Sequence, residues 1–132
     1  MAGTKEPRLT QLDTHAVIWL YEGALEQFSP AARQAIEAGR CAISPMVRLE
    51  LQYMFEIGRN ETDARTVLDI LRAQFDLDES RTEFSLVVLA ALPLAWTRDP
   101  FDRLIAAQAI CDDAVLITKD RTIRQHCPNA LW

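Results

Sequence analysis

Ala114-Val-Leu-Ile-Thr118 is the stretch of sequence that decides the fold. Its apolar residues follow one another without polar alternation, which is typical of a strand covered on both faces in a parallel sheet. The segment before it has helical periodicity, with a predicted buried face of Leu104, Ile105, Ala106, Ala109 and Ile110. A helix followed directly by a fully buried strand is the repeating unit of an α/β fold.

Working outward from this strand, three cap-plus-proline pairs mark the starts of helices. Ser29-Pro30, Ser44-Pro45 and Asp99-Pro100 each place a capping side chain before a proline at the first helical position. Residues 62–75 have a helical face made of Ala64, Val67, Leu68, Leu71 and Phe75. We therefore expect helices over 14–21, 30–39, 45–57, 62–75, 84–92 and from 100 onward, and strands over 8–13, 41–43 and 114–118. Residues 75–78 form a short strand or a loop, and 130–132 add a last short strand.

Strands that alternate with helices predict a three-layer α/β/α domain with a central, mainly parallel sheet. The chain has 132 residues, enough for one hydrophobic core without disulfide support. We expect a flexible leader over residues 1–8 and a single domain over 9–132. No internal repeat or low-complexity tract interrupts this organisation.

The formal net charge of −5 argues against a domain that holds nucleic acid mainly through a basic face. It does not exclude a nuclease, because bound metal ions neutralise a local acidic cluster. The three cysteines (Cys41, Cys111 and Cys127) are far apart and form no C-x-x-C pair, so a cytosolic protein without disulfides or a zinc site fits best. The longest apolar stretch, 84–96, is too short to span a bilayer, and we expect a cytoplasmic protein.

Two aspartates follow the predicted strands directly. Asp13 ends the first strand and Asp120 comes two residues after Thr118, and ligands in such sheets bind beyond the carboxyl ends of the strands. Each aspartate is equally well explained as the cap of the helix that follows it. Asp99 is best explained as a cap, whereas Asp102, in the first turn of the same helix, is explained only in part by the helix start.

Glu50 has a separate physical argument. Met46, Tyr53 and Ile57 lie at helical spacing from Glu50, so a carboxylate is expected in the middle of an apolar helix face. Such a carboxylate requires a metal or a cationic partner, and an ion pair with an arginine is the alternative to a metal. Clustered carboxylates without histidine or cysteine ligands favour Mg²⁺ or Mn²⁺, ions that support phosphodiester hydrolysis.

Four stretches occur in the order typical of one family. They are Leu12-Asp-Thr-His-Ala-Val-Ile-Trp19, Ser44-Pro-Met-Val-Arg-Leu-Glu50, Asp99-Pro-Phe-Asp-Arg-Leu-Ile-Ala-Ala-Gln108 and Leu116-Ile-Thr-Lys-Asp120. Together they resemble the PIN domain, and more narrowly the VapC-type toxins of toxin–antitoxin pairs. The resemblance covers nearly the whole chain, from about Leu9, and Asp99-Pro-Phe-Asp-Arg-Leu104 is its most distinctive part.

The resemblance implies an α/β/α ribonuclease that uses Mg²⁺ or Mn²⁺ and leaves a 5′-phosphate and a 3′-hydroxyl. By position, Asp13, Glu50 and Asp102 correspond to the core metal ligands, Asp120 to a fourth acid, and Asp99 and Thr118 to outer positions. The family also implies a homodimer and a small antitoxin protein that occludes the site. Residues near the motifs that are candidates for contact with RNA are Arg48, Arg98, Arg103, Lys119 and Arg121.

Several residues and functions have competing interpretations. Trp19, Tyr53 and Leu131-Trp132 are assigned to the core, with partner contacts as the alternative. His15 and His126 would suit a metal-free acid–base ribonuclease, but His15 lies in an apolar helix and is assigned a structural role. A nuclease fold that only binds RNA or a partner is one alternative function. A receiver-like phosphoacceptor domain is another, although it would have adjacent acids after the first strand, where this chain has Asp13-Thr14.

Overall fold

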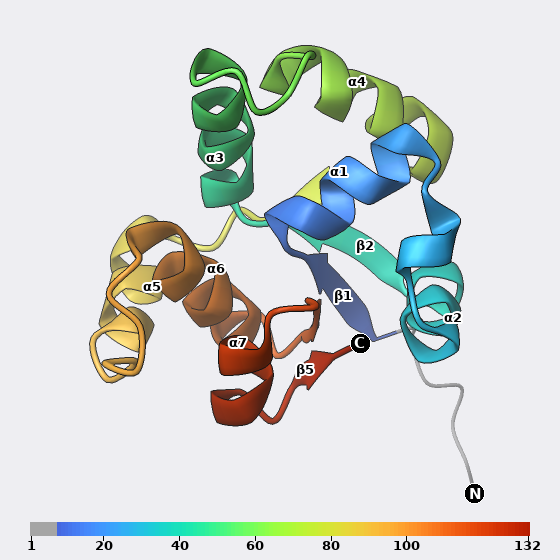
Figure 1. Ribbon diagram of the computed structural model, residues 1–132. Coiled ribbons are helices and arrows are strands. Elements are labelled where there is room, and N and C mark those ends of the chain that lie inside the picture. Colours follow the sequence, from blue (N-terminus) through green and yellow to red (C-terminus); the bar gives the residue numbers. More distant parts are fainter. Residues whose placement is uncertain (1–7) are drawn as a thin grey trace, which may run out of the picture.

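The computed structural model describes residues 8–132 and contains a five-stranded parallel sheet (Figure 1). The strand order is β3-β2-β1-β4-β5, so the chain moves from β1 toward one edge of the sheet and then crosses back to the other. All four strand pairings are parallel, as the buried apolar strand predicted. The strands are β1 (Leu9–Leu12), β2 (Arg40–Ile43), β3 (Asp78–Glu79), β4 (Val115–Ile117) and β5 (Ala130–Leu131).

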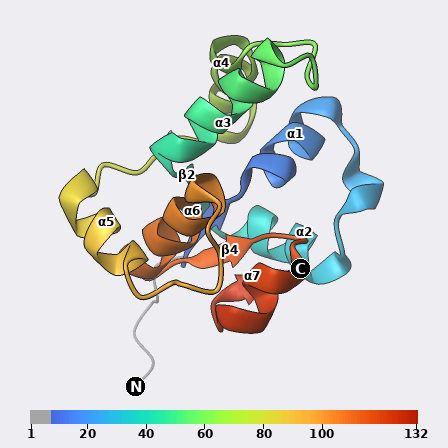
Figure 2. The same cartoon turned by 60° about the vertical axis from the view of Figure 1, so that its left-hand side comes forward.

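Helices cover both faces of this sheet, which confirms the three-layer prediction (Figures 1 and 2). Helices α1, α2 and α4 pack on one face and α5 and α6 on the other, as right-handed crossovers require when the direction of winding reverses after β3. Helix α3 contacts both α4 and α6. The helices are α1 (Thr14–Glu22), α2 (Pro30–Ala38), α3 (Pro45–Glu56), α4 (Ala64–Phe75), α5 (Phe84–Ala91), α6 (Pro100–Cys111) and α7 (Arg121–His126).

The predicted helix starts are correct in atomic detail. The Ser29 hydroxyl accepts the backbone N–H of Ala32, and the Ser44 hydroxyl accepts that of Met46. Asp99 caps α6 in the same way. Each cap satisfies a donor that the first turn of a helix leaves unpaired, and the following proline has no such donor to satisfy.

The sequence prediction differs from the structure in a few places. Residues 75–78, predicted as a short strand or a loop, belong to neither alternative as a whole. Phe75 ends α4, and only Asp78 and Glu79 form a strand. Phe75 and Ile110, both predicted on buried helix faces, are each 45% exposed. The predicted leader falls almost entirely on residues 1–7, outside the described residues. Within residues 8–132 no helix is long and apolar enough to cross a membrane.

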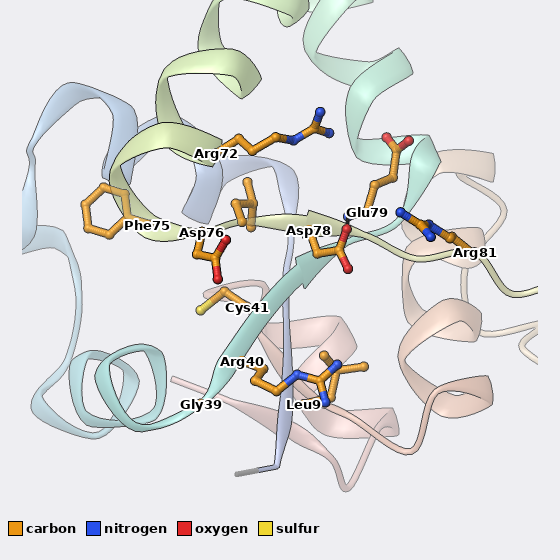
Figure 3. A pocket seen from close by; sticks show the side chains of 11 residues that line it. Leu9, Gly39, Arg40, Cys41, Arg72, Phe75, Asp76, Asp78, Glu79 and Arg81 are labelled. Carbon is orange, nitrogen blue, oxygen red and sulfur yellow. Dashed lines mark hydrogen bonds between the residues drawn. The ribbon is translucent and has the colours of Figure 1, made fainter. Parts of the chain in front are cut away.

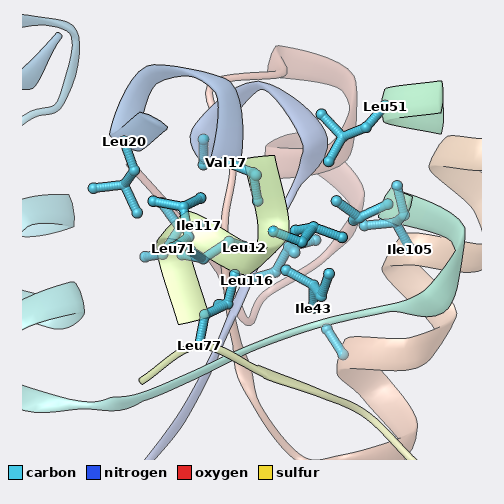
Figure 4. Packing of buried hydrophobic residues seen from close by; sticks show 14 of the residues in the cluster. Leu12, Val17, Leu20, Ile43, Leu51, Leu71, Leu77, Ile105, Leu116 and Ile117 are labelled. Atoms are coloured by element: carbon cyan, nitrogen blue, oxygen red, sulfur yellow. The ribbon is translucent and has the colours of Figure 1, made fainter. Parts of the chain in front are cut away.

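The main core packs the sheet against α1, α3 and α4 and continues to Leu116 of β4 and to Ile105, Ala106 and Ala109 of α6 (Figure 4). Leu12 and Ile117 come from adjacent strands, and their paired register points both toward the same face. Val17 from α1 and Leu71 from α4 are fully buried in the same cluster. This packing fixes the carboxyl ends of β1 and β4 relative to the helices that follow them.

A network of hydrogen bonds around Asp112 lies on the other face of the sheet from Leu12 and Ile117. The buried Gln11 side chain in β1 donates to the Asp112 carboxylate over 2.9 Å, and the Ser80 hydroxyl donates to it over 2.7 Å. Gln108 and Thr82 complete the donors around this carboxylate. Because Asp112 caps the carboxyl end of α6, the network ties that helix to the central strand. It explains why a glutamine is tolerated in the core.

Gly39, between α2 and β2, occupies a position too close to its neighbours for any side chain. A Cβ atom there would lie 2.3 Å from the Thr10 hydroxyl oxygen and 2.9 Å from the Ala35 carbonyl oxygen. We expect Gly39→Ala to lower the free energy of unfolding by about 2 kcal/mol through overpacking, measured by urea denaturation. Gly58→Ala is the control, since a Cβ there meets no atom within 4 Å and the cost is limited to about 1 kcal/mol from its left-handed backbone. Equal losses in the two variants would contradict this account.

Candidate functional site

All four predicted acids line one cavity of about 500 Å³ at the carboxyl end of β1 and β4. They come from four separate segments, because Asp13 follows β1, Glu50 lies in α3, Asp102 in α6 and Asp120 after β4. The strand ends and helix starts therefore meet where parallel α/β sheets bind ligands. The remaining lining residues are Thr14, His15, Trp19, Asp99, Ile105 and Lys119.

Asp13 is the buried member of the group, with 9% of its surface exposed. One carboxylate oxygen accepts the backbone N–H of Ala16 over 2.9 Å, so Asp13 is also the cap of α1. Burial raises the pKa of this carboxyl, while hydrogen bonds from the Thr118 side chain and the Ala16 N–H lower it. Capping and lining the cavity are thus compatible, because the backbone bond uses only one of the two oxygens.

Thr118 links two of the acids at the end of β4. Its side chain is fully buried, hydrogen bonds to Asp13, and accepts the backbone N–H of Asp120 over 3.1 Å. Asp120 in turn caps α7 through the N–H of Ile123. One hydroxyl therefore sets the relative positions of a buried and an exposed carboxylate.

Glu50 reaches the cavity, but the apolar helix face predicted around it is wrong. Tyr53 and Ile57 are 49% and 47% exposed, and the buried face of α3 consists of Val47, Leu51 and Met54. Glu50 instead lies at the border of that face and accepts a hydrogen bond from the Thr14 hydroxyl. Partial burial raises its pKa, and no ion pair to Glu50 occurs within residues 8–132. The arginine partner considered from the sequence is therefore absent from the described part of the chain.

Asp102 has a strongly perturbed carboxyl. Its pKa is raised to about 7, first by burial and then by the negative charges of Asp99, Glu50, Asp120 and Asp13. Asp99 caps α6 as predicted, accepting the N–H groups of Phe101 and Asp102 itself over 2.9 and 3.1 Å. Burial and the four nearby acids therefore both disfavour the charged form of the Asp102 carboxyl.

The carboxylates do not converge on a single point. Among residues 8–132, no three Asp, Glu, His or Cys side chains lie close enough together to hold one ion as they stand. Asp13, Asp99 and Asp120 are each oriented by the N-terminus of a helix, and the positive end of the helix dipole stabilises each charge. The donor set still suits Mg²⁺, since this ion keeps several waters and binds directly through one or two carboxylates.

The five basic residues predicted near the site differ in their surroundings. Arg48 forms an ion pair with Glu79 over 2.8 Å, and Arg103 donates to the carbonyl oxygens of Ala91 and Leu92. Lys119 alone among the five lines the cavity. Arg98 and Arg121 are exposed and flank α6 and α7 at their starts.

His15, predicted to have a structural role in an apolar helix, instead lines the cavity. It is exposed, lines the cavity beside Asp13, and its charge lowers the pKa of both Asp13 and Glu50. The apolar neighbours of His15 concealed its position, although its place one turn before Trp19 put both rings on one side of α1. Tyr53, assigned to the core, is exposed and stacks on Phe101 with ring centroids 6.0 Å apart. His126 stacks on Trp96 outside the cavity.

A second cavity of about 510 Å³ lies at the β3 edge of the sheet (Figure 3). Arg40, Arg72 and Arg81 reach it from β2, α4 and the segment after β3, beside the acids Asp76 and Asp78. None of the residues predicted for the site lines this cavity. This cavity is lined by both basic and acidic residues in equal number, whereas acids predominate in the acidic cavity.

Comparison with known proteins decides the family. The model of the PIN domain matches residues 11–127, which include all four acids. The chain belongs to the PIN domain family, in its VapC branch. Ribonuclease VapC22 of Mycobacterium tuberculosis is 36% identical over 118 residues, which cover 87% of this chain and 89% of that protein. Membership in this family sets aside the receiver-like interpretation.

Solved structures of VapBC proteins share the fold of this PIN domain. VapBC2 from Rickettsia felis, bound to a promoter DNA fragment, has a TM-score of 0.66 at 20% identity and covers 93% of this chain and 96% of the other. VapBC-1 from nontypeable Haemophilus influenzae has a TM-score of 0.60 at 19% identity and covers 94% and 96%. At this identity the likeness concerns the fold of the domain.

Proposed function

We propose that this PIN domain is an Mg²⁺- or Mn²⁺-dependent endoribonuclease that hydrolyses phosphodiester bonds of RNA. The observation that carries the proposal is the meeting of Asp13, Glu50, Asp102 and Asp120 in one cavity, with no ion pair to any of them within residues 8–132. An acidic cavity repels RNA unless cations neutralise it, so its chemistry requires a metal. The relationship to Ribonuclease VapC22 supports the same activity.

Each acid has a definable part in this proposal. Asp13, Glu50 and Asp102 would hold the metal, directly or through water, and Asp120, positioned by Thr118, would take an outer place. When bound, the metal supplies the positive charge that activates water and stabilises the leaving oxygen. Thr14 orients Glu50, and the Ala16 N–H and Thr118 orient Asp13, so the carboxylates are held in place before substrate arrives. Lys119 is the cation of the cavity wall that is placed to meet a phosphate.

The direct test is RNA cleavage with and without metal. Purified protein stripped with EDTA is expected to leave RNA intact, and added Mg²⁺ or Mn²⁺ is expected to restore cleavage, followed on denaturing gels. Products with 5′-phosphate and 3′-hydroxyl ends are expected, because water would add to phosphorus, the P–O3′ bond would break and the 3′ oxygen would leave with a proton. Undiminished cleavage in EDTA would exclude the metal-dependent mechanism. Wild-type protein that binds RNA but never cleaves it would favour the alternative of a binding protein.

The same proposal includes the role of toxin in a toxin–antitoxin pair. The solved structures that share this fold include a toxin–antitoxin complex from Klebsiella pneumoniae, with a TM-score of 0.60. We infer that a small antitoxin protein binds this chain and blocks the acidic cavity, and that the chain forms a homodimer. A mass of twice 15.0 kDa in analytical ultracentrifugation is the expected result for the dimer. Growth arrest on expression, relieved by the protein encoded beside this gene, tests the toxin role.

A further inference from the structure

Two aromatic rings stand on the wall of the acidic cavity. His15 and Trp19 both line it together with Asp13, and their ring centroids are 5.8 Å apart with planes tilted by 44°. They lie four residues apart on α1, so both project from the same side of that helix. A cavity that only held metal ions would have no use for an aromatic wall. The rings therefore suggest a ligand with a flat apolar face as well as a charge.

Trp19 is fixed in position by other rings behind it. Its ring meets Phe28 at 6.2 Å and Trp132 at 5.5 Å, both edge to face, and Trp132 stacks on Phe28 at 5.2 Å. These contacts anchor Trp19 to the core, yet the side chain remains only partly buried and open to the cavity. A ring held in this way loses little conformational entropy when a ligand stacks on it.

Lys119 places a positive charge over the rings of Trp19 and Trp132. Its ammonium nitrogen lies 5.6 Å from the centroid of Trp19 and 6.0 Å from that of Trp132, and the side chain is exposed. The wall thus combines an aromatic surface with an exposed cation at the border of the acidic site. A nucleotide has the matching pair of features, a flat base and a phosphate.

We infer that Trp19 and His15 form a stacking subsite for one unpaired base of the RNA, next to the phosphate held at the acids, and that Lys119 binds a neighbouring phosphate. This inference rests on the proposed nuclease function. The base must be unpaired, because the faces of bases inside a duplex are covered by their neighbours, whereas bases in loops are free to stack on aromatic or histidine rings. Stacking favours any base, so this subsite selects the single-stranded state of the RNA rather than its sequence.

The test compares oligomers that have equal phosphates but differ in their bases. Binding is measured by fluorescence anisotropy with labelled oligoadenylate, an abasic phosphoribose oligomer of equal length and the oligoadenylate–oligouridylate duplex, each about 12 nucleotides long. Ca²⁺ replaces Mg²⁺ to slow cleavage, and gels confirm that the oligomers remain intact. Wild-type protein is expected to bind the oligoadenylate about 5- to 100-fold more tightly than the abasic oligomer or the duplex.

Variants separate stacking from charge. Trp19→Ala is expected to abolish most of the preference for bases while leaving the abasic affinity unchanged, and Trp19→Phe retains most of it because phenylalanine still stacks. Lys119→Ala is expected to weaken all the oligomers alike and to reduce the dependence of affinity on salt. Trp96→Phe is the matched control, because Trp96 stacks on His126 outside the cavity.

His15→Ala serves as a second variant, since His15 is exposed and its removal spares the core. His15→Ala is expected to reduce the preference for bases, and it therefore tests the subsite independently of whether Trp19→Ala folds. An unchanged preference for oligoadenylate in His15→Ala and in every folded Trp19 variant would overturn the subsite alone. Wild-type protein that binds none of the three oligomers would overturn both the subsite and the proposed function.

Discussion

Asp13→Asn and Asp102→Asn are each expected to lower kcat/KM for RNA cleavage by at least about 100-fold, because outer partners of metal ligands alone contribute 10- to 100-fold. The substitution removes a negative charge and one strong oxygen ligand while keeping the size of the side chain. In Asp13→Asn the amide oxygen still accepts the Ala16 N–H, so α1 keeps its cap and the loss of activity is separated from loss of structure.

Asp63→Asn provides a control with matched chemistry. Asp63 caps α4 by accepting the Thr66 N–H over 2.8 Å, as Asp13 caps α1, but it does not line the acidic cavity. Asparagine is as good a cap as aspartate, so this variant is expected to keep wild-type activity. Initial rates are measured on one RNA that the wild-type protein cleaves, with thermal unfolding to verify folding. Full activity in Asp13→Asn and Asp102→Asn would refute the assignment of the site.

The arrangement of the sheet was predictable because its signals are local and strong. The uninterrupted apolar run at 114–118 specifies a buried parallel strand, and the cap-plus-proline pairs at Ser29, Ser44 and Asp99 define helix starts by chemistry that acts within one turn. The strand Asp78–Glu79 had no such signal, since two charged residues owe their strand geometry to pairing with Ala42 and Ile43. Tertiary pairing, and not local propensity, creates this edge strand.

The meeting of the four acids in one cavity was predictable, but their surroundings were not. The physical argument for Glu50 as a site residue assumed that its helix face is buried. Helical spacing identifies which residues share a face but not whether that face is buried. The exposure of Tyr53 and His15 depends on which helices pack nearby, and a single sequence does not contain that information. The ion pair of Arg48 with Glu79 likewise joins residues 31 positions apart.

The burial of Asp102 and the crowding of acids around it predict that the metal-free protein gains stability when this acid is neutralised. Asp102 has a pKa of about 7 in the folded protein and an ordinary value of 3.8, so the folded state binds more protons than the unfolded state between these values. Its contribution to stability is therefore most favourable below about pH 4, declines as the pH rises toward 7, and stays unfavourable above. Partial exposure of the side chain reduces the full effect to about 1 to 2 kcal/mol.

We accordingly expect Asp102→Asn to raise the thermal midpoint of the metal-free protein in EDTA at pH 8, with a gain that shrinks at pH 5. One kcal/mol corresponds to about 3 to 5 °C for a chain of this size. The comparison is made by differential scanning fluorimetry at both pH values, with Asp63→Asn as the variant expected to show no gain. A wild-type protein that is more stable than Asp102→Asn at pH 8 in EDTA would show that the carboxylates do not repel one another.

Metal is expected to reverse that order. At about 100 times its dissociation constant, Mg²⁺ or Mn²⁺ stabilises the folded wild-type protein by about 2.7 kcal/mol, because it binds the assembled acids and not the unfolded chain. Asp102→Asn lacks one metal ligand, so metal should stabilise it far less than the wild-type protein. The variant is therefore expected to be the more stable protein in EDTA and the less stable one at saturating metal. This reversal of the order of stability between wild type and variant is expected only where acids that bind a cation destabilise the fold in its absence. Equal shifts in both proteins would mean that the metal binds without Asp102, and the site would then have to be reassigned to the remaining acids.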